Sequence, residues 1–277
     1  MDWIKRTARP CLALFRLRLA EALQYRLAAL SGASISVFWA FLEMLVYTVF
    51  YTYGDNRAAL SDTLSLAQAI SYAWLAQVFF PLQPMSIDEE IHDKIVSGDV
   101  GLELCRPLDV YAHWFSKTAA GRLGGFCLRG GLILLCALLV PAPYRLQAPA
   151  SAAGFLLFLV SEFSAFLLCT AYGMLIASVR VGVTWGEGPT YMLLLLGGIL
   201  SGSYLPLQLW PESLQTLLLL QPFAGYLDIP LRLYVDSLSP AQAGLGLSLQ
   251  LAWTLLFVLL GRAVLQRQLK HIVVQGG

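Results

Sequence analysis

The stretch LSGASISVFWAFLEMLVYTVFYTY, residues 30–53, contains one charged side chain, that of Glu43, among aliphatic, aromatic and small polar residues. About 20 predominantly apolar residues suffice for an α-helix to cross the ~30 Å hydrocarbon core of a bilayer. This stretch is therefore predicted to be a transmembrane helix, which ends at Gly54-Asp55-Asn56.

The rest of the chain has the same composition. Of its 277 residues, 58% are hydrophobic and 13% are charged, whereas soluble domains have about 25% charged residues. A soluble protein with a rich core is the alternative, but apolar runs of spanning length recur along the chain. The net charge of +1 gives no reason to expect nucleic acid or another polyelectrolyte as a partner.

The pattern predicts a single all-α integral membrane domain, residues 1–277, with six transmembrane helices. The predicted segments are an interfacial helix within 1–27, spans at 30–53, 64–84, 118–141, 150–179, 189–209 and 243–265, a cytoplasmic loop at 85–117, outer re-entrant helices at 210–240 and a cytoplasmic tail at 266–277. The re-entrant pair is expected to break at Pro222 and to need burial for its leucines. A seventh span over 205–227 is the alternative, but it would place the basic C-terminal end outside.

The basic residues predict the orientation. If both termini are cytoplasmic, only Arg57, Arg145 and Arg232 of the 18 Lys and Arg residues lie outside, and Arg129 lies within a span. An excess of Lys and Arg in cytoplasmic loops is the usual arrangement. This orientation requires an even number of spans, as six provides.

The cytoplasmic loop at 85–117 is predicted to be structured. Ser86 and Glu89 have the spacing of a capping box, and Gly98 is a natural stop, so a short helix is expected over 87–97. Asp109 is expected to cap a helix that continues into the third span. The alternative is an ordinary solvated loop.

Three charged residues lie deep within predicted spans, away from the ends: Glu43, Arg129 and Glu162. Charges in the membrane are expensive and usually functional, so all three are candidates for a substrate pathway. Their spacing from the outer ends of their helices predicts similar depths, about 18 Å at ~1.5 Å per residue. We expect Arg129 to pair with Glu162, in either a structural or a transport role, and Glu43 to line a pathway.

Several motifs are missing or weak. The sequence has no G-x-x-x-x-G-K-[ST] and no H-E-x-x-H, and its five cysteines indicate neither a disulfide framework nor a metal site. Gly121–Gly125 and Gly198–Gly202 have G-x-x-x-G spacing, which permits close helix packing within the chain or between two chains. The chain is therefore not expected to be an enzyme or to bind a cofactor of its own.

The chain resembles the permease subunit of ABC-2 type transporters. The similarity includes the cytoplasmic pattern Gly98-Asp-Val-Gly-Leu-Glu-Leu104-Cys-Arg106-Pro107-Leu108-Asp109 and the outer Gln221-Pro222-Phe223 with Pro230 following. The order of interfacial helix, cytoplasmic helix and outer re-entrant hairpin is similar to that of type V exporters.

This resemblance implies an exporter in a bacterial inner membrane. Two permease subunits, identical or related, would each bind a separate cytosolic ABC ATPase, and that partner would hold ATP and Mg²⁺. The helix at 87–97 would be the coupling helix. Its expected ATPase contacts are Glu89, Glu90, His92, Asp93, Lys94 and Arg106.

Two other functions are weighed against this one. An ion-coupled secondary transporter would use the buried Glu43 and Glu162, but it would be expected to show internal symmetry, and no convincing repeat is found. A membrane-embedded enzyme or scaffold would need clustered His, Asp or Cys at the membrane face, and the sequence offers no such cluster.

Overall fold

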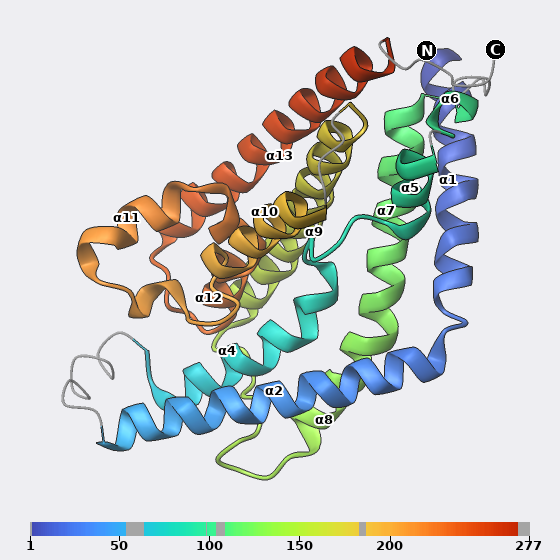
Figure 1. The fold of residues 1–277 in the computed structure, drawn as a ribbon. Coiled ribbons are helices and arrows are strands. Elements are labelled where there is room, and N and C mark those ends of the chain that lie inside the picture. The colour runs from blue at the N-terminus through green and yellow to red at the C-terminus, as the bar shows by residue number, and fades with distance from the viewer. Residues whose placement is uncertain (1, 54–63, 98, 104–108, 183–186, 271–277) are drawn as a thin grey trace.

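The computed structural model describes residues 2–53, 64–97, 99–103, 109–182 and 187–270 (Figure 1), and all regular structure in these ranges is helical. The elements are α1 (Asp2–Ala22), α2 (Arg26–Tyr53), α4 (Leu66–Phe79), η1 (Phe80–Leu82), α5 (Glu89–Ser97), α6 (Val100–Glu103), α7 (Val110–Gly125), the π-helical turn η2 (Phe126–Gly130), α8 (Gly131–Leu139), α9 (Ala152–Arg180), α10 (Glu187–Leu200), η3 (Leu207–Leu209), α11 (Glu212–Leu220), η4 (Pro222–Tyr226), α12 (Asp228–Tyr234) and α13 (Pro240–Leu269).

Four helices of the described part are long and apolar enough to cross a membrane: α2, α9, α13 and the continuous helix Val110–Leu139, which comprises α7, η2 and α8. Two shorter apolar helices, Leu66–Leu82 and Gly188–Leu200, overlap the predicted spans at 64–84 and 189–209. The topology of six spans stays a prediction. An all-helical chain with several such helices is consistent with the predicted integral membrane protein.

The predicted fifth span, 189–209, is too long. The helix α10 ends at Leu200, and the chain turns at Gly202, whose φ is +86°. A side chain at Gly202 would be both strained and obstructed, because its Cβ would lie 2.6 Å from the Tyr72 hydroxyl. The apolar sequence continues past this turn into η3, which is why hydropathy alone overestimates the helix.

The start of the third predicted span is confirmed as a capped helix that continues into the bundle. Asp109 accepts a hydrogen bond from the Ala112 amide at 2.8 Å, and α7 begins at Val110. The same carboxylate pairs with Arg262 of α13 at 2.6 Å. Asp109 therefore fixes the start of one long helix against the end of another.

The cap predicted for the cytoplasmic helix is wrong by two residues. The helix α5 begins at Glu89, and Asp88, not Ser86, accepts from the Ile91 amide at 3.4 Å. The Asp88 carboxylate is held in this position by Arg18 and Lys117. The predicted interfacial helix is present within residues 1–27, but α1 ends at Ala22, before the end of that range.

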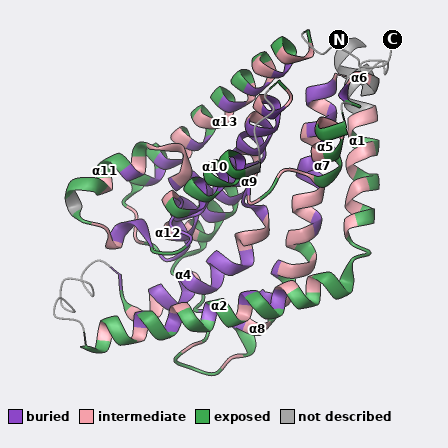
Figure 2. Cartoon of the chain, viewed as in Figure 1, coloured by how far each residue is buried: buried purple, intermediate pink, exposed green. Residues whose placement is uncertain are grey.

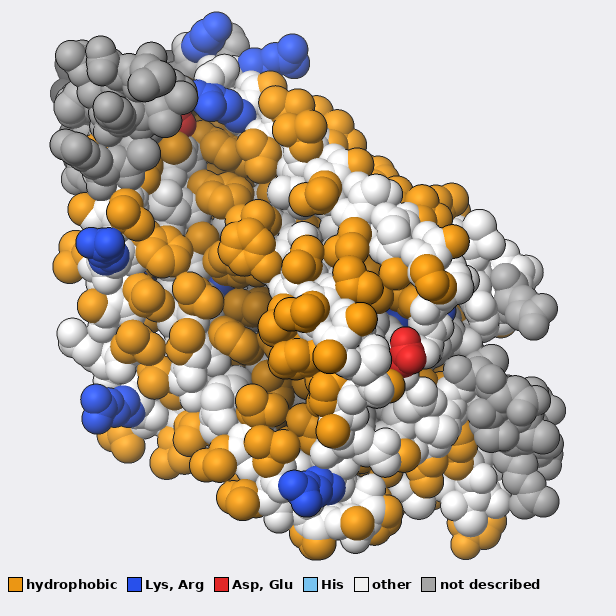
Figure 3. All heavy atoms as spheres, turned by 180° about the vertical axis from the view of Figure 1, so that it is seen from behind, with side chains coloured by type: hydrophobic (Ala, Val, Ile, Leu, Met, Phe, Trp, Pro, Cys, Tyr) orange, Lys and Arg blue, Asp and Glu red, His pale blue; other side chains and the backbone are white. Residues whose placement is uncertain are grey.

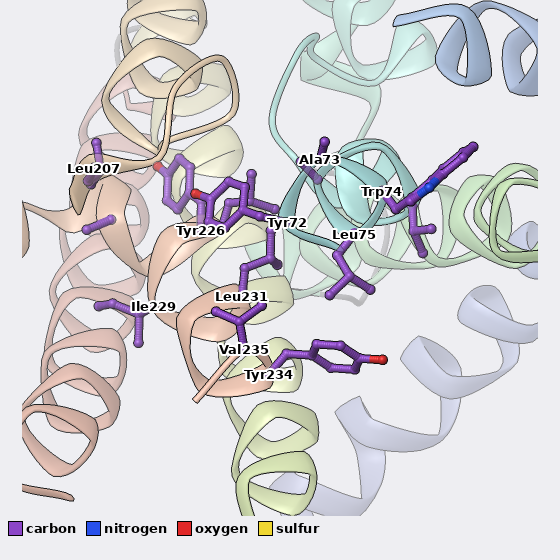
Figure 4. Packing of buried hydrophobic residues seen from close by; sticks show 14 of the residues in the cluster. Tyr72, Ala73, Trp74, Leu75, Leu207, Tyr226, Ile229, Leu231, Tyr234 and Val235 are labelled. Carbon is purple, nitrogen blue, oxygen red and sulfur yellow. The ribbon is translucent and has the colours of Figure 1, made fainter. Parts of the chain in front are cut away.

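The centre of the protein is α4, and every residue from Ala69 to Val78 is buried. Figure 2 shows this burial in α4, α9 and α12, in contrast to the exposed surfaces of α2, α11 and α13. Figure 4 shows Tyr72 and Leu75 of α4 near the hydrophobic side chains of η4 and α12. Viewed from behind, hydrophobic side chains cover most of the surface (Figure 3), as lipid contact requires.

The segment 210–240, predicted to hold a pair of outer re-entrant helices, contains three short helices: α11, η4 and α12. The predicted break at Pro222 is present, because this residue separates α11 from η4. The leucines of this segment that were expected to need burial differ in how far the chain itself covers them. Leu218 is buried, whereas Leu214, Leu217 and Leu220 are exposed. In a membrane protein this exposed apolar face of α11 can contact lipid or another subunit.

Close packing of α1 on α7 depends on a glycine that the G-x-x-x-G motif does not identify. A Cβ at Gly124 would lie 2.5 Å from the Ala22 Cβ, whereas those at Gly121 and Gly125 would lie at 3.9 Å and 3.8 Å from Asp88 and Pro81. The backbones of α1 and α7 can approach this closely only because residue 124 has no side chain.

We predict that Gly124→Ala lowers the free energy of unfolding by about 1–3 kcal/mol, because the two helices must move apart. Thermal unfolding in mild detergent would measure this loss. The matched control is Gly131→Ala in α8, where a Cβ meets nothing within 4 Å. Equal effects of the two substitutions would show that the Gly124 contact is not limiting.

Candidate functional site

The helix α5 is attached to the bundle mainly through the apolar side chain of Ile91, with Ile95 packed beside it. Ile91 is 1% exposed and belongs to a second hydrophobic cluster built from α5, α6, α7, α9 and α13. The other buried members of this cluster are Val100, Val110, Tyr111, Trp114, Met174, Ala177 and Leu265. A displacement of α5 must therefore also displace these helices or break the cluster.

Ion pairs reinforce this attachment. Asp88 lies 3.3 Å from Arg18 of α1 and 3.5 Å from Lys117 of α7. Glu90 pairs with Lys117 and, at 2.9 Å, with Lys94. Partial burial tends to raise the pKa of Glu90, but the hydrogen bonds and charges of Lys117 and Lys94 outweigh it and lower the pKa to about 2. Glu90 therefore stays ionised at neutral pH.

The opposite face of α5 is exposed. It presents Glu89, Asp93 and Val96 at helical spacing, and Val96 is 68% exposed. Among the described residues, Glu89 and Asp93 form no ion pair. We call the surface formed by Glu89, Asp93 and Val96 the outer face of α5. This face is free to contact another molecule.

The predicted ATPase contacts therefore divide into two groups. Glu89 and Asp93 lie on the outer face of α5, whereas Glu90 and Lys94 are engaged in ion pairs within the chain. The His92 Nδ1 lies 3.4 Å from an Arg180 guanidinium nitrogen, so it faces α9. Arg106 lies outside the described residues.

Beside α5 lies a cavity of about 770 Å³, which we call the inner cavity. Its walls come from α1, the start of α2, η1, α5, α7 and η2. The charged side chains that line it are Arg18, Glu21, Asp88, Glu89, Glu90, Asp93, Arg122 and Arg129. Residues from both predicted sets therefore line this cavity. Glu89 and Asp93 of α5 are predicted ATPase contacts, and Arg129 of η2 is a predicted substrate-pathway residue.

The predicted Arg129–Glu162 ion pair does not form. The Arg129 Nε donates to the Ser36 hydroxyl of α2 at 3.2 Å, and its guanidinium carbon lies 5.3 Å from the centre of the Phe80 ring. Glu162 is buried in α9, and its Oε1 has no hydrogen-bond partner in the described part of the chain. The two residues share a depth along their helices but face different neighbours.

Glu43 also has a different environment from Glu162. Its Oε1 accepts a hydrogen bond of 3.3 Å from Gln77 of α4. Below it, Tyr47 is buried on the same face of α2. The structure therefore places the three membrane charges in three separate environments and does not join them into one polar pathway.

Comparison with known proteins gives one match. The family model described as "ABC-2 family transporter protein" matches residues 37–276, which include every described helix from α4 to α13. This chain belongs to the ABC-2 transporter family. No curated protein and no solved structure matched it. Members of this family are generally membrane subunits that partner with an ABC ATPase.

This ABC-2 family chain also contains a buried carboxylate, Asp228, that is not among the residues predicted from the sequence. Asp228 is 0% exposed, accepts from the Leu207 amide at 3.0 Å and from the Tyr72 hydroxyl at 3.2 Å, and lies 3.6 Å from Arg232. It fixes α12 and η3 to the central helix α4. The apolar sequence around Asp228 is the signal in the sequence that could have indicated its burial.

We predict that Arg129→Gln and Glu162→Gln have additive effects on stability, within about 0.5 kcal/mol, because the residues do not touch. Arg129→Gln and Ser36→Ala should instead couple by about 0.5–3 kcal/mol. Double-mutant cycles on unfolding in detergent would measure both terms. A large coupling with Glu162 would restore the ion-pair hypothesis.

We also predict that Tyr72→Phe lowers the free energy of unfolding by about 1 kcal/mol, because Asp228 and the Gly202 carbonyl both lose the Tyr72 hydroxyl. The same change at Tyr204, which is 53% exposed, is the matched control and should have little effect. If the two variants unfold alike, the Asp228 cluster does not hold the outer segment.

Proposed function

We propose that this chain is the permease subunit of an ATP-driven ABC exporter and that α5 is its coupling helix. Membership of the ABC-2 family supports the first part. The second part is supported by one observation: α5 is fixed on one face and exposed on the other. Such a helix can receive a push from a partner and transmit it to the bundle.

The transmission would pass through α7. Lys117 links α7 to Asp88 and Glu90 at α5, and the helix that contains it continues without interruption to Leu139. Arg18 connects the same α5 region to α1. A movement of α5 on ATP-driven closure of the partner would therefore move α7, η2 and α8 together.

The partner would supply the nucleotide chemistry. The sequence of this chain has no phosphate-binding glycine motif, so ATP and Mg²⁺ would bind to a separate cytosolic ATPase. The acidic outer face of α5 favours a basic docking cleft on that partner. A second permease subunit, identical or related, would complete the transport pathway in the bacterial inner membrane, with both termini in the cytoplasm.

An ion-coupled secondary transporter is less well supported. It would need Glu43 and Glu162 to cooperate in binding an ion, but Glu43 contacts Gln77 of α4 whereas Glu162 is buried alone on α9. No group of three or more His, Cys, Asp or Glu residues in the described ranges could hold a metal ion.

We predict that Glu89→Lys/Asp93→Lys abolishes copurification of an ABC ATPase from the native host without changing the melting temperature of the permease. The outer face of α5 would then repel a basic cleft, while the buried face stays intact. The neutral variant Glu89→Gln/Asp93→Asn should retain part of the bound ATPase. Immunoblotting or mass spectrometry of the purified complex measures the ratio.

Two controls make this test specific. Arg145→Glu reverses a charge on the exposed connection between α8 and α9 and should leave the ATPase bound. Glu90→Gln removes an ion pair within the chain, so it should lower the melting temperature more than it lowers binding to the folded protein. Retention of the ATPase by the Lys variant would refute α5 as the docking helix.

A further inference from the structure

Two arginines of the inner cavity have no carboxylate partner. The Arg122 Nη1 donates to the Leu82 carbonyl at 2.9 Å, and its buried Nε has no hydrogen-bond partner. Arg129 contacts only a hydroxyl and an aromatic ring. Neither forms an ion pair among the described residues. Two guanidinium groups that lack an ion-pair partner beside one cavity favour the binding of an anion next to them.

The local backbone is built to hold Arg129 at this cavity. Arg129 lies in the π-helical turn η2. Such turns are rare in proteins overall, but those that occur are often found at functional sites. Gly32 of α2 faces its side chain, where a Cβ would lie 3.4 Å from the Arg129 Cδ. Gly130 packs so closely that its Cβ would lie 2.7 Å from the Val78 carbonyl oxygen. These glycines leave room for the guanidinium between α2 and α4.

Three of the five acidic residues that line the cavity are already paired, whereas Glu89 and Asp93 of α5 form no ion pair among the described residues. Asp88, Glu90 and Glu21 are paired with Arg18, Lys94 or Lys117. Along the third predicted span, Lys117 is at the α5 end and Arg129 is 12 positions further on, about 18 Å at ~1.5 Å per residue. The unpaired carboxylates of the cavity therefore lie on α5, whereas Arg129 lies toward its other end, with Arg122 between Lys117 and Arg129 along the helix.

We propose that the inner cavity binds the headgroup of one anionic phospholipid, with its phosphate between Arg122 and Arg129. Guanidinium groups bind phosphate oxygens through charge-assisted hydrogen bonds. The cavity volume of about 770 Å³ is within the usual ~300–1,000 Å³ of ligand sites. This site does not depend on ATPase coupling and would exist in the isolated permease.

A lipid fits better than a free anion because the cavity walls are continuous with an apolar surface. Ala28, Ala29 and Leu128 line the cavity together with the arginines. Around the corner between α1 and α2, Tyr25 is 63% exposed and Leu27 is 85% exposed. A lipid with its phosphate in the cavity can therefore leave its acyl chains along this surface, in the leaflet nearest α5.

The test is native mass spectrometry of the full chain in an uncharged detergent, titrated with short-chain phosphatidylglycerol or phosphatidylcholine. We expect one phosphatidylglycerol per chain, bound more tightly than phosphatidylcholine. Arg129→Gln should weaken phosphatidylglycerol binding by about tenfold or more, because a charge-assisted contact is lost. Arg129→Lys keeps the charge and should restore part of the affinity.

The control is Arg16→Gln, which removes an exposed arginine of α1 outside the cavity and should leave binding unchanged. Melting temperatures measured without lipid show whether each variant is folded. Unchanged binding by Arg129→Gln would overturn the site, and equal loss with Arg16→Gln would indicate general surface attraction instead. Displacement of the lipid by millimolar inorganic phosphate would identify a free-anion site and refute the lipid assignment.

Discussion

The structure depends on satisfying the polar side chains of α4, a helix that is buried along most of its length. In an apolar environment, an unpaired polar group costs several kcal/mol, so each must find a partner inside the protein. Each partner lies in a different element. The Tyr72 hydroxyl reaches Asp228 of α12, the Trp74 indole reaches the Tyr144 carbonyl, and Gln77 reaches Glu43 of α2.

Two further bonds complete this arrangement. The Gln68 amide donates to the Val235 carbonyl at 2.8 Å, just beyond α12, and the Ser71 hydroxyl accepts from the Gln147 amide at 3.2 Å. The polar groups of one helix therefore fix α2, the α8–α9 connection and α12. Hydrophobic packing brings these elements together, but it does not select their rotation as strictly as these directional bonds do.

The charged residues outside this core are organised along the continuous helix that begins with α7. The ion pair between Asp109 and Arg262 fixes the N-terminus of this helix. Further along it, Lys117 pairs with Glu90 of α5, and Arg129 lines the inner cavity. The proposed coupling helix and the proposed lipid site thus both contact one continuous helix. Asp109, the last residue of the cytoplasmic motif that suggested the family, has a clear structural role as both helix cap and ion-pair partner.

The sequence by itself determined the helical class, the approximate spans, the cap at Asp109 and the break at Pro222, because these depend on hydrophobic length and local backbone chemistry. It also placed Glu43, Arg129 and Glu162 at similar distances along their helices. It could not determine which way each side chain faces. Only the tertiary structure decided that Arg129 meets Ser36, that Asp228 is buried, and that Glu89 and Asp93 are free while Glu90 is paired. The physical reason is that residue spacing fixes position along a helix axis, whereas rotation about that axis depends on packing against neighbours distant in sequence.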